Sequence, residues 1–195
     1  MTEIRPLTPR PEVLDFLLTR RSRPAKTLAD EGPTRAELET ILTAAARCPD
    51  HGKLEPWRFV VISGEARGRV AGAAMARAGA LGQDAAGIEK TASAFRQGAV
   101  IVAVIASAKP SEKIPDWEQD MSAGAVCLSL LNAALAAGWG ANWLSGPMAR
   151  DPEFLAGTLG CRPGEFVAGF IHIGRATVVP AERPRPDVRA LTTLL

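Results

Sequence analysis

The sequence predicts an α+β fold in which helices are layered against a β-sheet. The expected elements follow one another as helix, helix, strand, two helices, strand, long helix, short strand, helix and strand. Helices outnumber strands, and no regular strand–helix–strand alternation appears, which argues against a doubly wound parallel sheet. At 195 residues the chain is long enough to bury a sizeable core, so we expect one domain spanning residues 1–195.

Two helices are expected before the first strand. Apolar side chains recur every three or four residues over 13–18, and this helix runs up to Arg20, with Pro24 preventing its extension. The second begins at a capping box, in which Thr34 and Glu37 satisfy each other's backbone donors. It carries apolar residues on one face and is expected to end at Pro49.

Three further segments have strand patterns. Residues 57–62 are β-rich, and residues 99–107 form a continuous apolar run that is typical of a strand buried on both faces. Residues 166–173 form the last strand. Between the first two, residues 65–97 are rich in Ala and Gly, so we expect two loose helices there.

The longest helix is expected over residues 117–137, and beyond Ala123 it is apolar nearly all round. A helix that is apolar on every side must be buried on every side, which indicates a second subunit packed over it. A short strand and a helix capped by Asp151 and Pro152 follow. The proline-rich tail, residues 175–195, is expected to be irregular and to reach over the partner subunit.

Composition excludes several classes of protein. The net charge of +2 and the absence of tyrosine argue against nucleic-acid binding. Three widely spaced cysteines do not form a disulfide framework, so a reducing cytoplasm is expected. Residues 1–6 contain no apolar stretch, so no signal peptide is expected, and the apolar run over 123–137 is too short and too polar to span a membrane.

Two basic clusters carry the functional signal. The first is Arg20-Arg21-Ser22 at a helix exit, where guanidinium groups can grip an anion bidentately. The second is the segment from Arg47 to His51, at the end of the next helix, so both clusters could face one phosphate-bearing ligand. Taken alone, the first cluster is better explained as a solvated basic helix terminus, and the second cluster is what favours a bound ligand. His172, inside an apolar strand, is expected to be a satisfied sheet residue.

Other chemistries find little support in the sequence. Two histidines without suitably spaced cysteines or carboxylates do not predict a zinc site. The chain has no Gly-x-Ser-x-Gly nucleophile elbow, no Gly-x-Gly-x-x-Gly fingerprint and no Walker loop. Glu118 and Asp120 could be paired acid–base carboxylates, although solvated first-turn residues of a helix have the same pattern.

Taken in order, these pieces resemble the flavin-dependent nitroreductase family, and within it the small minimal branch of NAD(P)H nitroreductases. The resemblance covers nearly the whole chain and rests on four anchors. They are Arg20-Arg21-Ser22, Arg47-Cys48-Pro49-Asp50-His51 with Pro56-Trp57, Trp117-Glu118-Gln119-Asp120-Met121-Ser122-Ala123-Gly124, and Trp143-Leu144-Ser145-Gly146.

The resemblance implies a three-layer α+β sandwich, with a mostly antiparallel sheet flanked by helices, that forms a homodimer binding FMN at the subunit interface. It implies that Arg20, Arg21 and Ser22 hold the FMN phosphate and ribityl region. It implies further cofactor contacts, some from the partner subunit. These are Arg47 and His51 for FMN, Trp143, Leu144 and Ser145 along the isoalloxazine ring, and Ala133, Ala134, Leu135, Ala136, Ala137 and Gly138 for NAD(P).

The implied activity is FMN-dependent reduction of nitroaromatic or quinone-type small-molecule acceptors, with NAD(P)H as co-substrate. The implied mechanism is ping-pong hydride transfer, and neither a catalytic side chain nor a metal is expected. The alternative is a non-catalytic flavin-binding, flavin-buffering or regulatory dimer on the same fold. The chain departs from the family in two places: Asp50, Lys53 and Glu55 stand in the loop before Pro56-Trp57, and Leu144 stands where the minimal branch commonly has Arg. Arg175, after the last strand, is a candidate for a further phosphate contact.

Overall fold

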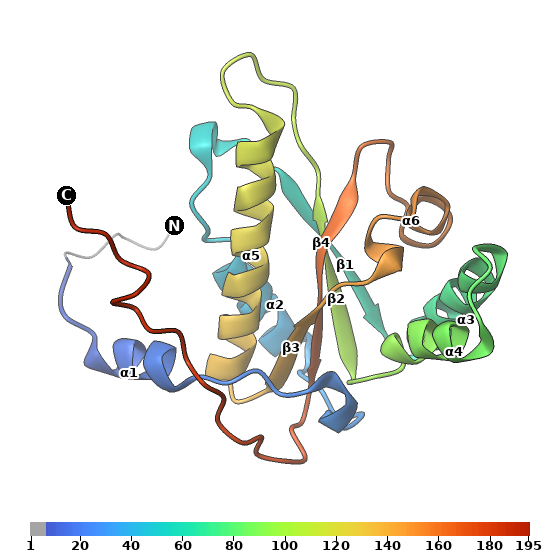
Figure 1. Ribbon diagram of the computed structural model, residues 1–195, viewed down its shortest axis with the longest axis horizontal. Helices are drawn as coiled ribbons and strands as arrows, with labels where there is room; N and C mark the ends of the chain where they lie inside the picture. Colours follow the sequence, from blue (N-terminus) through green and yellow to red (C-terminus); the bar gives the residue numbers. More distant parts are fainter. Residues whose placement is uncertain (1–6) are drawn as a thin grey trace.

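The computed structural model describes residues 7–195, so the expectation about a leader segment falls on residues outside that range. The centre of the fold is one four-stranded sheet in the order β1-β2-β4-β3. Its strands are β1 (Trp57–Ser63), β2 (Val100–Ala106), β3 (Gly140–Leu144) and β4 (Phe166–Gly174). All three pairings are antiparallel, and β1 and β3 form the two edges (Figure 1).

The interior strand β2 is buried at every position, as its continuous apolar sequence predicts. It pairs with β1 from Trp57–Ala106 to Ser63–Val100. Its pairing with β4 shifts register between Val104 and Ile105. This irregularity alters which β4 side chains point to each face.

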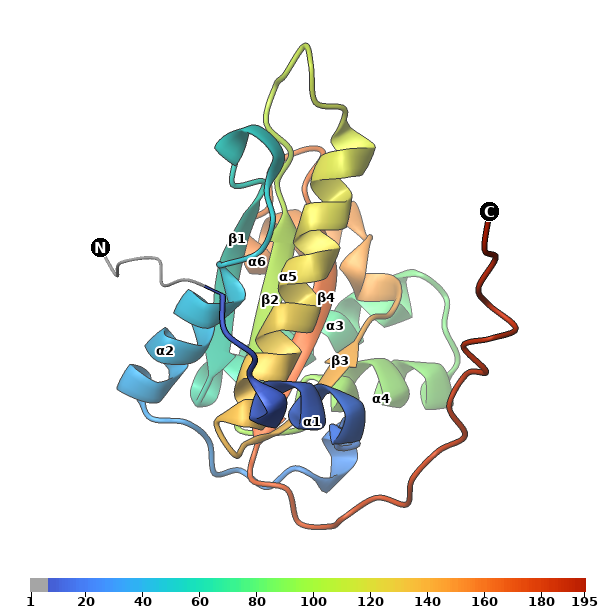
Figure 2. The ribbon, with the colours of Figure 1, turned by 90° about the vertical axis from the view of Figure 1, so that its left-hand side faces the viewer.

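Helices cover both faces of the sheet, which gives three layers (Figures 1 and 2). One face packs against α2 (Arg35–Ala45) and α5 (Asp116–Ala136), and the other against α3 (Glu65–Ala80), α4 (Ala85–Ala94) and α6 (Pro152–Leu159). The predicted order of elements and the α+β sandwich with an antiparallel sheet are confirmed.

The helix ends follow the local sequence signals. Thr34 accepts a hydrogen bond from the Glu37 amide, and the Glu37 carboxylate accepts one from the Thr34 amide, so the capping box before α2 is formed. Asp151 caps α6 by accepting from the Phe154 amide at 2.8 Å. The helix α2 ends earlier than predicted, at Ala45 rather than at Pro49, and an irregular turn follows.

The first helix, α1 (Pro11–Thr19), buries none of its residues. Its apolar side chains, including Leu14 and Leu18, are exposed. The helix lies across the C-terminal end of α5 (Figure 2). An amphipathic helix with an exposed apolar face is usually covered by a partner.

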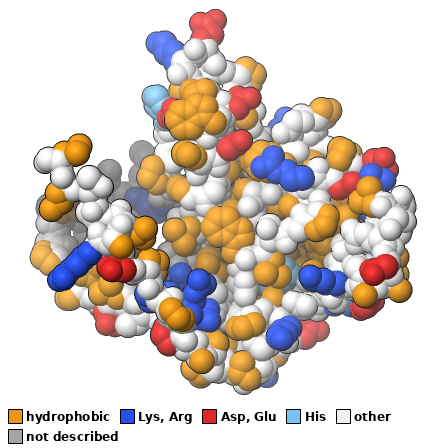
Figure 3. Space-filling model, viewed as in Figure 1, with side chains coloured by type: hydrophobic (Ala, Val, Ile, Leu, Met, Phe, Trp, Pro, Cys, Tyr) orange, Lys and Arg blue, Asp and Glu red, His pale blue; other side chains and the backbone are white. Residues whose placement is uncertain are grey.

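The long helix α5 buries one face against the sheet, with Val126, Leu130 and Ala134 fully enclosed. Its other face exposes Trp117, Met121 and Leu128. Hydrophobic side chains follow this helix on the face shown in Figure 3. The chain alone therefore does not bury α5 on every side, and the second subunit that its sequence calls for remains a prediction.

The tail after β4 contains no helix or strand, as predicted. Its first part runs back along its own chain, where Ala176 bridges to Leu28 and the Thr177 amide donates to the Thr27 carbonyl. The tail then passes the exit of α1, and its last residues extend away from the domain with exposed Leu191, Leu194 and Leu195 (Figures 1 and 2). Their placement over a partner remains a prediction.

Candidate functional site

The first basic cluster lies at the outer edge of strand β3. The Arg23 amide donates to the Ala141 carbonyl at 2.9 Å, and Asn142 Nδ2 donates to the Arg23 carbonyl at 2.9 Å. These two bonds fasten the segment after α1 to an otherwise open strand edge. Within the cluster, Arg20 Nη2 donates to Ser22 Oγ at 3.0 Å. Arg20, Arg21 and Ser22 therefore stand together, as the sequence predicts.

The cluster is rich in unpaired positive charge. The Nε atoms of Arg20 and Arg21 are buried and have no hydrogen-bond partner among residues 7–195. Burial, with the neighbouring Arg185 and Arg21 guanidinium groups, lowers the pKa of Arg20. Glu182 lies beside them, 2.8 Å from Arg185. Buried donors without acceptors are costly, so this arrangement suits an anionic ligand such as a phosphate.

The sequence did not single out Arg185, which belongs to the C-terminal tail. The return of the tail places its Nη2 atom 3.4 Å from the Arg20 carbonyl oxygen. The Arg-Pro-Arg pattern of residues 183–185 is the one signal that could have drawn attention to it. We call Arg20, Arg21 and Arg185 the arginine cradle. Arg175, which the sequence offered as a phosphate contact, instead donates from Nε to Glu31 Oε2 at 2.5 Å.

The segment Trp143-Leu144-Ser145 continues from the cradle along the β3 edge. The Trp143 indole lies against the backbone of Gly169, where an added Cβ would be only 2.3 Å from Nε1. Beyond it, Leu144 and Ser145 line a cavity of about 580 Å³ that α4 covers from the other side. Lys90 is the single Lys, Arg, Asp or Glu among its lining residues, which are otherwise polar-neutral or apolar apart from His172. The cradle and this α4 cavity are thus joined by one strand edge.

The second cluster lies at the opposite end of α5. His51 Nδ1 is 2.6 Å from Glu118 Oε1 in the first turn of that helix, and Cys48 Sγ donates to the Ser122 carbonyl at 3.8 Å. The Arg47 side chain is exposed nearby in sequence. A helix of 21 residues is about 31 Å long. Within one chain, therefore, the two clusters do not meet on one ligand.

The loop that presents His51 is held by Asp50. Its carboxylate accepts hydrogen bonds from the Leu54 and Glu55 amides. Lys53 and Glu55 both have positive φ angles. Such backbone is unfavourable for residues other than glycine and needs support from its surroundings. Asp50 supplies that support, so its departure from the family pattern has a structural role in this loop.

Residues 133–138, which the resemblance assigns to NAD(P), span the end of α5. Ala134 is fully buried, and Leu135 packs into the core. Ala133 and Ala136 line a shallow groove of about 420 Å³ with Val13 and Phe16 of α1. A ligand can therefore reach only part of this stretch in the chain alone.

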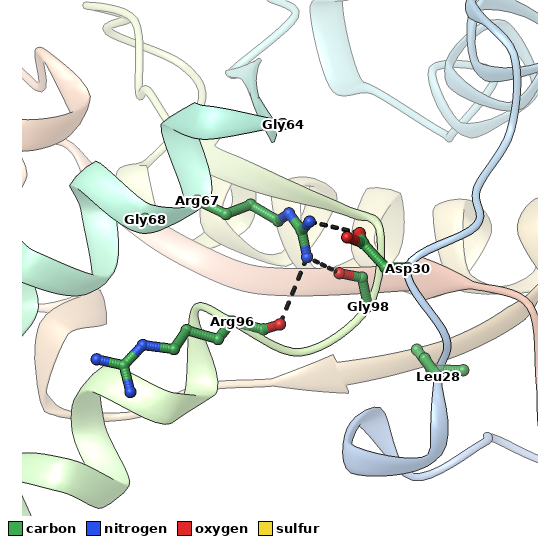
Figure 4. Close-up of a pocket in the computed structure, with 7 residues that line it drawn as sticks. All are labelled: Leu28, Asp30, Gly64, Arg67, Gly68, Arg96 and Gly98. Atoms are coloured by element: carbon green, nitrogen blue, oxygen red, sulfur yellow. Dashed lines mark hydrogen bonds and ion pairs between the residues drawn. The ribbon is translucent and has the colours of Figure 1, made fainter.

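Two other polar features lie outside the basic clusters. Arg67 donates to the Asp30 carboxylate and to the Gly98 carbonyl, which ties α3 to the segment before α2 and to the start of β2 (Figure 4). Asp120 lies two residues beyond Glu118 on α5, and burial raises the pKa of its carboxyl group. Within residues 7–195, no group of three or more His, Cys, Asp or Glu side chains is placed to hold a metal ion. No helix in that range is long and apolar enough to cross a membrane.

Comparisons with known proteins show the family and the fold. The model of the "Nitroreductase family" matches residues 17–175. The Escherichia coli K12 protein named "Putative NAD(P)H nitroreductase YdjA" is 37% identical over 163 residues, which cover 84% of this chain and 87% of that protein. A nitroreductase-like protein from Bacillus cereus has a TM-score of 0.78 at 22% identity, covering 97% of this chain and 99% of that one.

A structure from Desulfovibrio desulfuricans, described as a nitroreductase in complex with FMN, has a TM-score of 0.73 at 23% identity. The match covers 96% of this chain and 99% of that chain. These two structural likenesses establish the fold, while the family model and the E. coli relative establish kinship. The chain therefore belongs to the nitroreductase family of oxidoreductases.

Proposed function

We propose that this protein is an FMN-dependent oxidoreductase that uses NAD(P)H to reduce nitroaromatic or quinone-type acceptors, and that it works as a homodimer. The observation that carries the proposal is the arginine cradle, with its buried and unpartnered Arg20 and Arg21 Nε atoms. The cradle lies on the same strand edge as a cavity large enough for a ring system. Relatives named as NAD(P)H nitroreductases and FMN-bound neighbours support the choice of ligands.

In this proposal FMN lies along the edge of β3. Its phosphate would bind Arg20, Arg21, Ser22 and Arg185, where guanidinium donors still lack acceptors. A strand of five residues spans about 17 Å, which leads from the cradle to the α4 cavity. Trp143, Leu144 and Ser145 then border the isoalloxazine ring, and edge-strand backbone groups supply its hydrogen bonds.

The partner subunit would complete the site. Arg47 and His51 stand about one α5 length from their own chain's cradle, so in our proposal they serve the FMN of the other subunit. The exposed apolar faces of α1 and α5 supply the surface that a second copy would cover. A two-fold dimer would place each chain's second cluster at its partner's cradle.

Bound FMN would supply the hydride and electron transfer between NAD(P)H and the acceptor. The chain's own residues bind, orient and exclude water. Arginine side chains offset the negative charge of the phosphate, and the walls of the cavity select flat molecules. The reachable part of residues 133–138 is proposed to contact the dinucleotide. No side chain needs to act as a general acid or base.

Two measurements test this function. The purified protein should be yellow, and anaerobic NADH or NADPH at millimolar concentration should bleach the flavin absorbance. A yellow protein that neither nucleotide bleaches would instead be a non-catalytic flavin-binding, flavin-buffering or regulatory dimer. A colourless protein that takes up no FMN on titration would contradict the proposal and its alternative together.

A further inference from the structure

The side chain of His172 is a buried polar group in the α4 cavity that the proposed function leaves unused. It lies on β4, is 1% exposed, and follows Phe170 by two positions, so both point to the face covered by α4. Its neighbours around the cavity include Phe95, Gln97, Leu144 and Lys90. The sequence predicted a satisfied sheet residue, and the contact of Nδ1 with the Gln97 carbonyl agrees with that, while Nε2 has no hydrogen bond to residues 7–195.

The hydrogen bond on one ring nitrogen fixes the role of the other. His172 Nδ1 lies 3.0 Å from the Gln97 carbonyl oxygen. A carbonyl oxygen only accepts, so Nδ1 carries the proton and donates. Burial lowers the pKa of His172, which keeps the ring neutral. Nε2 is then a lone-pair acceptor, and it has no hydrogen-bond partner among residues 7–195.

The surroundings define the group that Nε2 can accept from. Phe95, Phe170 and Leu144 give the cavity apolar walls, which suit a flat ring. Lys90 is a donor, but it belongs to the exposed side of α4. An acceptor that lines this cavity favours a ligand that brings its own donor, because the donor then keeps a hydrogen-bond partner when it leaves water.

We propose that Nε2 of His172 accepts a hydrogen bond from an N–H or O–H group on the edge of a planar ring that enters the α4 cavity. The inference rests on the proposed function for the identity of the ring. The ring belongs either to the flavin, whose imide edge presents the N3–H group, or to an aromatic electron acceptor that carries a hydroxyl group. Both supply a donor on a flat ring, and the experiment separates them.

Two substitutions divide the functions of the two ring nitrogens. His172→Asn keeps an amide N–H near the position of Nδ1, so it can still donate to Gln97, but it removes the acceptor at the far end of the ring. His172→Gln reaches the position of Nε2 with an amide oxygen and keeps an acceptor there. Circular dichroism establishes that each variant is folded before any titration.

The first arm measures the affinity of the apo-protein for FMN and for N3-methyl-FMN by quenching of flavin fluorescence. If the flavin is the donor, N3-methylation weakens binding about threefold to tenfold in the wild type and in His172→Gln. The same methylation then has a clearly smaller effect in His172→Asn. Equal effects in all three proteins exclude the flavin as the donor.

The second arm measures the dissociation constants of 4-nitrobenzyl alcohol and its methyl ether, on both the apo-protein and the FMN-loaded protein. The hydrogen-bond donor could instead be the electron-accepting substrate. In that case the wild type and His172→Gln bind the alcohol more tightly than the ether, and this preference is about threefold to tenfold larger than the preference of His172→Asn. If neither pair of ligands separates the wild type from His172→Asn, the inference is overturned. Absence of FMN binding to the wild type would overturn the proposed function instead, and the apo-protein titration would still decide the role of His172.

Discussion

His51 Nδ1 lies 2.6 Å from Glu118 Oε1, so the loop that carries His51 is fixed to the first turn of α5. At the other end of this helix, the Arg23 amide bonds to the Ala141 carbonyl, and the arginine cradle begins there. One rigid helix therefore holds the two basic clusters apart within the chain. If both clusters serve one cofactor, they must come from different subunits.

Complementation between two inactive chains tests this arrangement. One chain carries Arg20→Ala with Arg21→Ala, and the other carries Arg47→Ala with His51→Ala. Each alone should lose FMN during gel filtration, because each homodimer has two incomplete sites. Co-expression should restore about one intact site in four, since heterodimers hold one site with both clusters intact. The flavin absorbance per protein chain measures the fraction of sites that retain FMN.

The control for that experiment is the heterodimer itself, purified through two different affinity tags. If this species forms but retains no FMN, the clusters do not act across the interface. If the Arg47→Ala, His51→Ala homodimer keeps all its flavin, the second cluster has no part in the site.

Arg185 should contribute to FMN affinity although it lies far from Arg20 and Arg21 in sequence. Its guanidinium group is partly exposed and already has Glu182 as a partner at 2.8 Å, so the expected loss is modest. Arg185→Gln should weaken FMN binding by about 1 kcal/mol, or roughly fivefold. Inorganic phosphate should also compete less well with FMN for the variant than for the wild type. Arg183→Gln removes an equal charge from an exposed side chain two residues away and should have a smaller effect. Identical losses would point to general charge rather than to the cradle.

The sequence predicted local features better than distant contacts. The capping box of Thr34 and Glu37 and the apolar run of β2 determine their own structure, so those elements were predictable. Arg185 reaches Arg20 only because the tail folds back over 165 positions, and no short-range pattern encodes that return. The apolar sequence of α5 predicted a further covering surface, and that prediction stays open, because periodicity indicates that a side chain is apolar but not which molecule covers it.

Gly169 is expected to be necessary for the position of the Trp143 indole. A Cβ at residue 169 would be 2.3 Å from Trp143 Nε1 and 2.8 Å from its Cδ1. The indole, which is partly exposed, would have to move away from the sheet. Gly169→Ala should therefore change Trp143 fluorescence and weaken its quenching by bound FMN. Gly157→Ala, where a Cβ has no neighbour within 4 Å, provides a control that should leave both signals as in the wild type.

Glu165 should be a strong contributor to stability away from the site. Its nearly buried carboxylate accepts from Arg58 Nη2 at 2.8 Å and from Arg162 Nη2 at 2.7 Å. Hydrogen bonds from Arg58 hold its pKa well below the ordinary range for glutamate. The stabilisation is thus complete above the unfolded pKa of about 4.3 and is lost as the pH falls further. Glu165→Gln should lower the free energy of unfolding at pH 7 by about 2 kcal/mol.

The matched control for Glu165 is Glu89→Gln, which breaks an exposed pair with Arg96 at 2.9 Å. Its cost should be below about 1 kcal/mol. Urea unfolding of the three proteins at pH 7 and pH 4 makes the comparison. Equal costs for the two substitutions would show that the Arg58 and Arg162 contacts add no special stability.

His172 should make the protein less stable in mild acid. Burial lowers its pKa in the folded state, so the unfolded chain, with an ordinary pKa of about 6.5, takes up the proton first. The contribution of neutral His172 to the free energy of unfolding is therefore complete above pH 6.5. It falls as the pH decreases towards the lowered pKa, by at most about 1.4 kcal/mol per pH unit. His172→Asn, which keeps a donor for Gln97, should flatten the fall in urea-unfolding free energy between pH 7.5 and 5.5. His51→Gln, which replaces the exposed histidine, gives the comparison with a site outside the core. If His172→Asn keeps the slope of the wild type, His172 is protonated as easily in the folded chain as in the unfolded one.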